Sequence, residues 1–124
     1  MCNSDAVKTR STKLVFQSAL PVLLFAKHQT KLTLRGKTDE QKTPPIDYTK
    51  FIFLPFLKRH FGVDCTLEVH KRGLSSLDGG EVSITVNPVN GRLKCISLLE
   101  RGDIVSFTGI IWNAKEDYKM VLAS

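Results

Sequence analysis

The first run of apolar residues with helical spacing covers residues 14–26. Its stripe consists of Val15, Ala19, Val22 and Ala26, and the buried face is widened by Leu20, Leu23 and Leu24. Ser11 or Thr12 precedes the run and can cap a helix, because its hydroxyl accepts backbone N–H bonds. Pro21 lies inside the run, so we expect a kink there, since proline removes one hydrogen bond of the helix.

A second helix is predicted between a proline-led entry and a glycine stop. Thr43 is followed by Pro44 and Pro45, and proline fits the first turn of a helix, where its missing N–H has no partner to lose. The helix runs to about residue 61, and Gly62 is its stop. Its apolar face is formed by Ile46, Phe53, Phe56 and Leu57. Pro55 predicts a second kink.

Strands are predicted where apolar and polar residues alternate. The clearest segments are 63–70 and 81–87, with a short one at 31–35 and weaker ones at 95–99 and 104–112. The order helix, strand, helix, strand, strand predicts an α+β fold with two helices packed on one face of a mixed sheet. Such a sheet needs a strand before the first helix, and the polar residues 1–10 show no strand pattern. We therefore predict that the first strand is missing from this chain.

The charge of the chain is concentrated near its N-terminus. The formal net charge is +6 at pH 7, and residues 1–44 carry eight basic against three acidic residues. This basic third suits contacts with nucleic-acid phosphates, and it equally suits a solvated basic face. A small basic α+β module that binds RNA is one function consistent with the charge.

Cysteines and histidines give no pattern of a metal site or disulfide framework. The three cysteines are Cys2, Cys65 and Cys95, an odd number without a C-x-x-C pair. The three histidines, His28, His60 and His70, show no metal-ligand spacing. We predict no metal-binding residues.

The apolar segment 14–26 is too short to span a bilayer, because a membrane helix needs about 20 apolar residues. Basic residues before it are typical of a secretory signal, but no small-x-small cleavage pattern follows. We read it as a buried helix and expect no membrane association.

Two features are candidates for ligand contacts. Residues 71–80 are basic and glycine-rich, which suits either an anion-binding loop or a tight hairpin turn. Gln17 is an amide inside an apolar helical run; it either contacts a nucleotide or faces solvent from the polar edge of the helix.

Five segments in register resemble the RNA 3'-terminal phosphate cyclases. They are residues 17–26 (the family's LxxQxxLPxLLFA helix), 34–39 (L-x-G-G-T-[ND]), 43–48 (A-P-x-x-D-[YF]), 72–82 (R-G-x-x-P-x-G-G-G-x-hydrophobic) and 99–102 ([TG]-E-R-G). Lys37, Ser76 and Asp78 stand where these motifs have glycine, proline and glycine.

The resemblance implies a reaction on RNA 3'-phosphate ends. Such cyclases use ATP, with Mg²⁺, to convert an RNA 3'-phosphate into a 2',3'-cyclic phosphodiester through an adenylylated histidine. Their ATP-contacting glutamine and proline match Gln17 and Pro44, whereas none of the three histidines matches the nucleophile. We therefore predict Gln17 and Pro44 as nucleotide-binding residues and no catalytic residue in this chain.

The resemblance also implies an organisation. The family is built from βαβαββ repeats with an inserted small domain. Residues 1–10 would be a polar N-terminal segment, 11–95 an αβαββ repeat and 96–124 the start of a truncated insert. The implied location is the nucleoplasm, with the cytoplasm or nucleolus as alternatives. The alternative function is that of a non-catalytic cyclase-like protein acting as a binding factor in ribosomal RNA processing.

Overall fold

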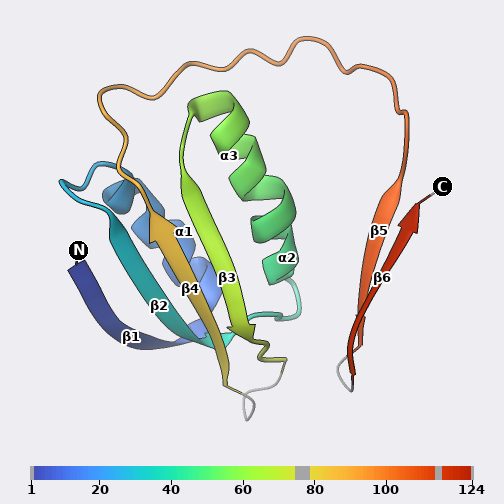
Figure 1. The fold of residues 1–124 in the computed structure, drawn as a ribbon, viewed down its shortest axis with the longest axis horizontal. Helices are drawn as coiled ribbons and strands as arrows, with labels where there is room; N and C mark the ends of the chain where they lie inside the picture. The colour runs from blue at the N-terminus through green and yellow to red at the C-terminus, as the bar shows by residue number, and fades with distance from the viewer. Residues whose placement is uncertain (1, 75–78, 114–115, 124) are drawn as a thin grey trace.

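The computed structural model describes the backbone of residues 2–74, 79–113 and 116–123, and the side chains of residues 11–74 and 79–110. Two helical segments and six strands follow one another along this part of the chain (Figure 1). The elements are β1 (Cys2–Ser11), α1 (Thr12–Leu24), β2 (Thr30–Lys37), α2 (Ile46–Tyr48), η1 (Thr49–Phe53), α3 (Leu54–Phe61), β3 (Cys65–Lys71), β4 (Gly80–Val86), β5 (Thr108–Asn113) and β6 (Glu116–Ala123).

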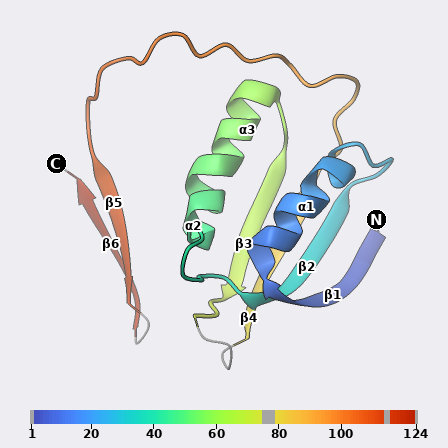
Figure 2. The same cartoon turned by 180° about the vertical axis from the view of Figure 1, so that it is seen from behind.

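A four-stranded mixed sheet forms the main body. Its strand order is β1-β2-β4-β3, with β1 parallel to β2 and the other two pairings antiparallel. Both helical segments cover the same face of this sheet, which is seen from the helix side in Figure 2. The predicted α+β class and the two helices on one face are therefore confirmed.

The prediction that the first strand is missing is wrong. Cys2–Ser11 forms β1, which pairs along the edge of the sheet with β2, from Cys2 opposite Thr30 to Ser11 opposite Lys37. The order β1, α1, β2, helix, β3, β4 is thus a whole βαβαββ unit. Polar residues have low strand propensity, so pairing with β2 rather than local pattern makes this segment a strand.

The core is formed by the apolar residues that alternate along the strands and by the buried faces of the two helical segments. The centre of the sheet contributes Leu34, Val82, Ile84 and Val86, all almost completely buried, and Leu32 and Leu67 lie beside them. The helices contribute Phe16, Leu20, Leu24, Ile46 and Leu54. The predicted alternation in residues 63–70 and 81–87 is confirmed, since its apolar members face the helices.

The first helix buries a different stripe from the predicted one. Val22 is 74% exposed, whereas Leu20 and Leu24 are buried as expected. Of its five buried residues, four recur every four positions, at Thr12, Phe16, Leu20 and Leu24, and the fifth is Lys13. The two apolar stripes are adjacent on the helix, so the docking of α1 onto the sheet decides which one is covered. The helix continues through Pro21 and ends at Leu24.

The second helix changes its winding just before Pro55. Residues Thr49–Phe53 form a π-helical turn between the two α-helical parts. Pro55 has no N–H to donate back along the helix, and a π turn is one way to accommodate such a loss. The predicted stop at Gly62 is confirmed, because this residue takes a left-handed φ of 69° and its N–H donates to the Lys58 carbonyl.

The C-terminal part is less regular than predicted. Residues 95–99 form no strand, and Leu98 and Leu99 are exposed there. Strand β5 occupies the second half of the predicted segment 104–112 and pairs with β6 in a separate two-stranded sheet (Figure 1). Among the described residues, no helix has the length and apolar character needed to cross a membrane.

Candidate functional site

A groove of about 320 Å³ lies between α1 and the start of the second helix. Gln17 lines it from α1, and Pro44 lines it from the loop that leads into α2. The two residues are far apart in the sequence, and the fold brings them to one pocket. Two residues that bind the same nucleotide must lie close together in this way. Gln17 is exposed, so its amide is available to a ligand and carries no burial penalty.

The remaining walls of the groove are mostly apolar and aromatic. They consist of Leu14 and Phe16 from α1, Tyr48 from α2, and Thr49 and Phe53 from η1. Aromatic side chains at a groove offer flat surfaces on which a planar ring can stack. A glutamine amide offers one acceptor and two donor hydrogens to the edge of such a ring.

Lys13 contributes a positive charge to the same groove. Its ammonium nitrogen donates to Thr43 Oγ1 at 2.7 Å, and the Thr43 hydroxyl donates to the Glu40 carbonyl at 3.1 Å. Burial lowers the pKa of Lys13, and the negative charges of Asp39 and Glu40 oppose this effect. Sequence reasoning missed Lys13, although its spacing of four residues from Gln17 places both on one helix face.

An arginine holds the loop that carries Thr43 and Pro44. Arg72 donates from Nη2 to Asp47 Oδ1 at 2.6 Å and from Nη1 to Asp39 Oδ2 at 3.3 Å. The other oxygen of Asp39 accepts the backbone N–H of Ile46 at 3.3 Å. Both ends of the loop are thereby tied to the segment that follows β3.

Thr38 and Gly73 tie the same two segments together by one backbone hydrogen bond and one to the Thr38 hydroxyl. The Thr38 N–H donates to the Gly73 carbonyl at 3.0 Å, and the Gly73 N–H donates to Thr38 Oγ1 at 3.0 Å. Gly80 packs against this contact so closely that a Cβ would lie 2.6 Å from the Gly36 oxygen and 2.7 Å from the Gly73 nitrogen. A side chain at this position has no room.

The glycine-rich segment joins β3 to β4, which pair antiparallel as a hairpin. The hairpin is therefore confirmed, but the tight turn is not, because residues 72–79 separate the two strands and neither Gly73 nor Gly79 has a positive φ. Residues 75–78, including Ser76 and Asp78, lie outside the described residues. The close packing around Gly80 explains why a glycine is needed at this position without any bound anion.

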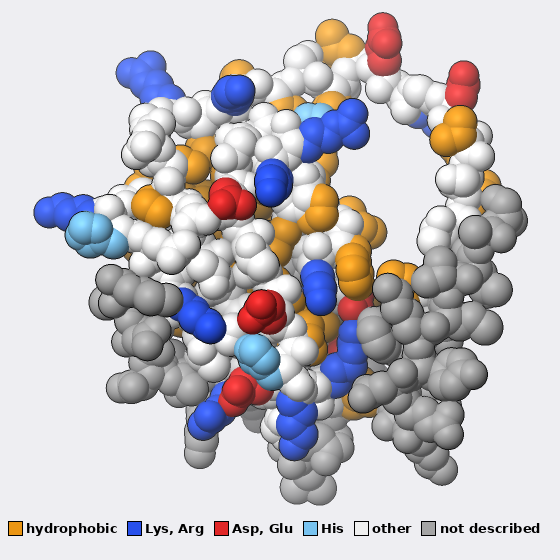
Figure 3. Space-filling view, in the orientation of Figure 1, with side chains coloured by type: hydrophobic (Ala, Val, Ile, Leu, Met, Phe, Trp, Pro, Cys, Tyr) orange, Lys and Arg blue, Asp and Glu red, His pale blue; other side chains and the backbone are white. Residues whose placement is uncertain are grey.

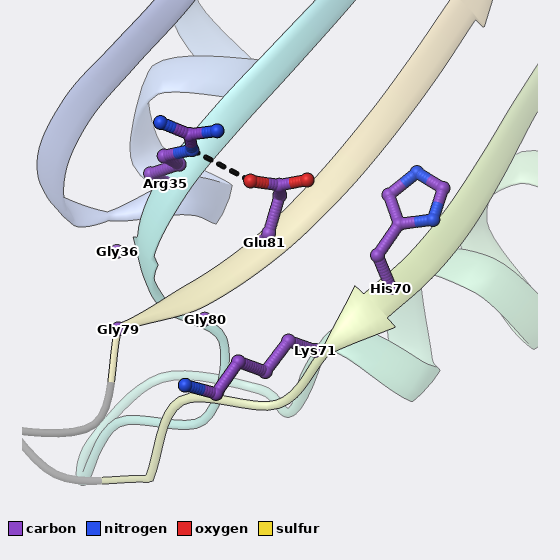
Figure 4. A pocket seen from close by; sticks show the side chains of 7 residues that line it. All are labelled: Arg35, Gly36, His70, Lys71, Gly79, Gly80 and Glu81. Carbon is purple, nitrogen blue, oxygen red and sulfur yellow. Dashed lines mark hydrogen bonds and ion pairs between the residues drawn. The ribbon is translucent and has the colours of Figure 1, made fainter.

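A second hollow of about 530 Å³ lies on the sheet face opposite the helices, where β3 ends and β4 begins (Figure 4). There, Arg35 Nε donates to Glu81 Oε2 at 2.6 Å, and His70 lies on the neighbouring strand with Lys71 below it. Figure 3 shows basic and acidic side chains interspersed over this face. Because Glu81 pairs with Arg35 there, this hollow has less attraction for a polyanion than a uniformly basic surface.

None of the three histidines lines the groove that holds Gln17. His70 Nε2 lies 2.7 Å from Ser83 Oγ on the open sheet face, and the His60 ring lies 4.6 Å from the Phe56 ring. Within the described ranges, no group of three or more His, Cys, Asp or Glu side chains is arranged to hold a metal ion.

The chain is similar to known proteins over almost its whole length. The family model described as RNA 3'-terminal phosphate cyclase matches residues 1–120. The RNA 3'-terminal phosphate cyclase of Staphylothermus marinus is 43% identical over 100 residues, covering 81% of this chain and 28% of its own length. Those of Pyrobaculum neutrophilum and Halobacterium salinarum are 37% and 40% identical, covering 87% and 79% of this chain. The chain spans less than a third of each of these relatives.

Proposed function

The chain belongs to the RNA 3'-terminal phosphate cyclase family, and on this premise we propose that its groove is part of the nucleotide site of an ATP-dependent RNA 3'-phosphate cyclase. The observation that carries the proposal is the convergence of Gln17 and Pro44 on one pocket. The two residues belong to separate sequence motifs, residues 17–26 and 43–48, and each matches a residue that contacts ATP in the family.

The proposed reaction converts an RNA 3'-phosphate into a 2',3'-cyclic phosphodiester. ATP transfers AMP to the terminal phosphate and releases pyrophosphate, and the adjacent ribose 2'-hydroxyl then attacks the phosphorus and expels AMP. Activation supplies the leaving group, and the neighbouring hydroxyl has the advantage of an intramolecular attack.

In this reaction the chain would contribute binding rather than bond making. Gln17 provides an amide for hydrogen bonds to the nucleotide, and Tyr48, which is 44% exposed, provides an aromatic surface beside it. Pro44 lies in a loop fixed by Arg72 and Asp47, so its position is set before the nucleotide arrives. The donor set therefore fits a nucleotide.

We assign no nucleophile to His28, His60 or His70, since none lies on the groove. The described residues also provide no cluster suited to Mg²⁺: Asp39 and Asp47 are both bonded to Arg72. No step of the proposal is assigned to the metal. A nuclear location stays a prediction, to be checked by imaging the tagged protein.

Equilibrium dialysis of ATP against the full 124-residue chain tests the proposal. We expect Q17A to weaken ATP binding about three- to tenfold, which is the loss of one hydrogen bond. Q41A is the matched control, because Gln41 is an exposed amide that does not line the groove. Equal affinities of the wild-type, Q17A and Q41A chains would exclude this groove as the ATP site.

A second experiment tests the absence of a nucleophile. The chain is incubated with ATP labelled at the α-phosphate and Mg²⁺, and covalent label on the protein is measured. We expect none, and a stable adduct would overturn that assignment. A folded chain with no affinity for ATP would instead favour the non-catalytic cyclase-like function in ribosomal RNA processing.

A further inference from the structure

The groove contains a cation that the family motifs do not include, namely Lys13. Resting on the proposed function, we infer that Lys13 binds the phosphates of the nucleotide held by Gln17 and Pro44. Lys13 lines the groove from the first turn of α1, one helical turn before Gln17, and only 8% of the residue is exposed.

The ammonium group of Lys13 lacks a compensating anion within the described part of the chain. Its bonded partner is the neutral hydroxyl of Thr43, and no described carboxylate lies within 4.0 Å of Nζ. A buried charge is costly unless it is paired. An anionic ligand in the groove would supply the missing charge.

The two nearest acids are engaged elsewhere. Glu40 lies 3.8 Å from Lys37 Nζ, and Asp39 bonds to Arg72 at 3.3 Å. Their charges act on Lys13 only at longer range, and burial outweighs them in lowering its pKa.

The position of Lys13 on the helix supports an anionic ligand independently. The N-terminal end of a helix carries a partial positive charge, and α1 has no acidic residue in its first turn. A lysine in the first turn of a helix is unfavourable by itself, because both its ammonium group and the helix N-terminus are positive. An anion that lies between the ammonium group and the helix N-terminus makes this arrangement favourable. The polyphosphate would then lie at the Lys13 end of the groove, and the base beside Tyr48 and Phe53.

The test compares ligands that differ in phosphate alone. Dissociation constants for ATP, AMP and adenosine are measured on the wild-type chain, K13M and K13R, with K27M as the control. Lys27 is exposed, does not line the groove and changes the net charge equally. Circular dichroism checks that each variant is folded.

We expect K13M to bind ATP about tenfold or more weakly, since a bond to a charged group is worth about 1.5–3 kcal/mol. Adenosine should bind K13M and the wild type equally, K13R should recover part of the ATP affinity, and K27M should match the wild type. Tight binding of ATP by K13M, with Q17A impaired, would overturn the role of Lys13 and leave the proposed function standing. A wild-type chain that binds none of the three ligands would overturn both.

A further arm separates the phosphate of the nucleotide from that of RNA. Short oligoribonucleotides ending in a 3'-phosphate or a 3'-hydroxyl are measured on the same variants. If K13M loses affinity for the 3'-phosphate oligonucleotide and keeps its affinity for ATP, the assignment to the nucleotide is overturned.

A measurement on the wild-type chain covers the case in which K13M does not fold. Lysine acetylation rates are followed residue by residue by mass spectrometry. ATP should slow the acetylation of Lys13 at least severalfold more than adenosine does, with Lys27 unaffected. Equal protection by ATP and adenosine would overturn the inference.

Discussion

The Arg72 guanidinium lies 2.6 Å from the Asp47 carboxylate, and this contact joins the segment after β3 to the first turn of the second helix. Both side chains are largely buried, at 24% and 17% exposed. The same guanidinium also reaches Asp39, so three of the five family motifs meet at one cation. The loop that presents Pro44 to the groove runs between the two acids.

Arg72→Met should therefore lower both stability and ATP affinity. Two largely buried carboxylates would lose their partner, and we expect the free energy of unfolding to fall by about 2 kcal/mol or more. ATP binding should weaken because the loop with Pro44 is no longer held. Urea denaturation and equilibrium dialysis measure the two effects.

Arg35→Met is the control for this substitution. Arg35 also bonds to an acid, Glu81 at 2.6 Å, but its side chain is 55% exposed. Exposed ion pairs contribute little because water and salt screen them. An equal loss of stability in both variants would contradict the role given to the Arg72 contact.

Gly80→Ala should be far more damaging than Gly79→Ala. An added Cβ at residue 80 would lie 2.6 Å from the Gly36 oxygen and 2.7 Å from the Gly73 nitrogen, whereas one at residue 79 meets nothing within 4 Å. Overpacking against backbone typically costs about 1–3 kcal/mol. The midpoint of urea unfolding compares the two variants, and equal midpoints would show that the backbone around Gly80 yields.

The local sequence pattern predicted those helices and strands whose own residues determine their conformation. The strands around Leu67 and Ile84 alternate cleanly, and Gly62 supplies the left-handed residue that ends the second helix. Strand β1 has no such signal, since its partner β2 imposes its conformation. Sequence similarly identifies Gln17 and Pro44 by motif, but the burial of Lys13 depends on where the loop with Thr43 lies.

The choice between the two stripes of α1 can be measured directly. Leu20→Ala should lower the free energy of unfolding by about 2–5 kcal/mol, because Leu20 is 6% exposed in the core. Val22→Ala should change it little, because Val22 is 74% exposed. The reverse order of effects would mean that α1 docks on the sheet through the stripe that contains Val22.

The two described cysteines should differ strongly in reactivity. Burial, assisted by the charge of Asp64, raises the pKa of the Cys65 thiol from 9.0 to about 12, whereas Cys95 is exposed. Since the thiolate is the reactive form and only about one Cys65 thiol in a thousand is ionised at pH 9, iodoacetamide at that pH should alkylate the exposed Cys95 far faster than Cys65. Mass spectrometry of the native chain measures both rates, and urea should make them similar. Equal rates in the native chain would contradict the burial of Cys65.

The same pKa shift predicts how stability depends on pH. The unfolded thiol ionises near pH 9 and the folded thiol only near pH 12, so the folded state retains its proton over this range. The free energy of unfolding should be unaffected by this group below about pH 9 and should fall as the pH rises from about 9 towards 12. Cys65→Ala removes this contribution, and Cys95→Ala, its matched control, retains it. We therefore expect the stability difference between Cys65→Ala and the wild type to change in favour of the variant above pH 9. A difference that stays constant with pH would mean that the Cys65 thiol ionises as readily in the folded chain as in the unfolded one.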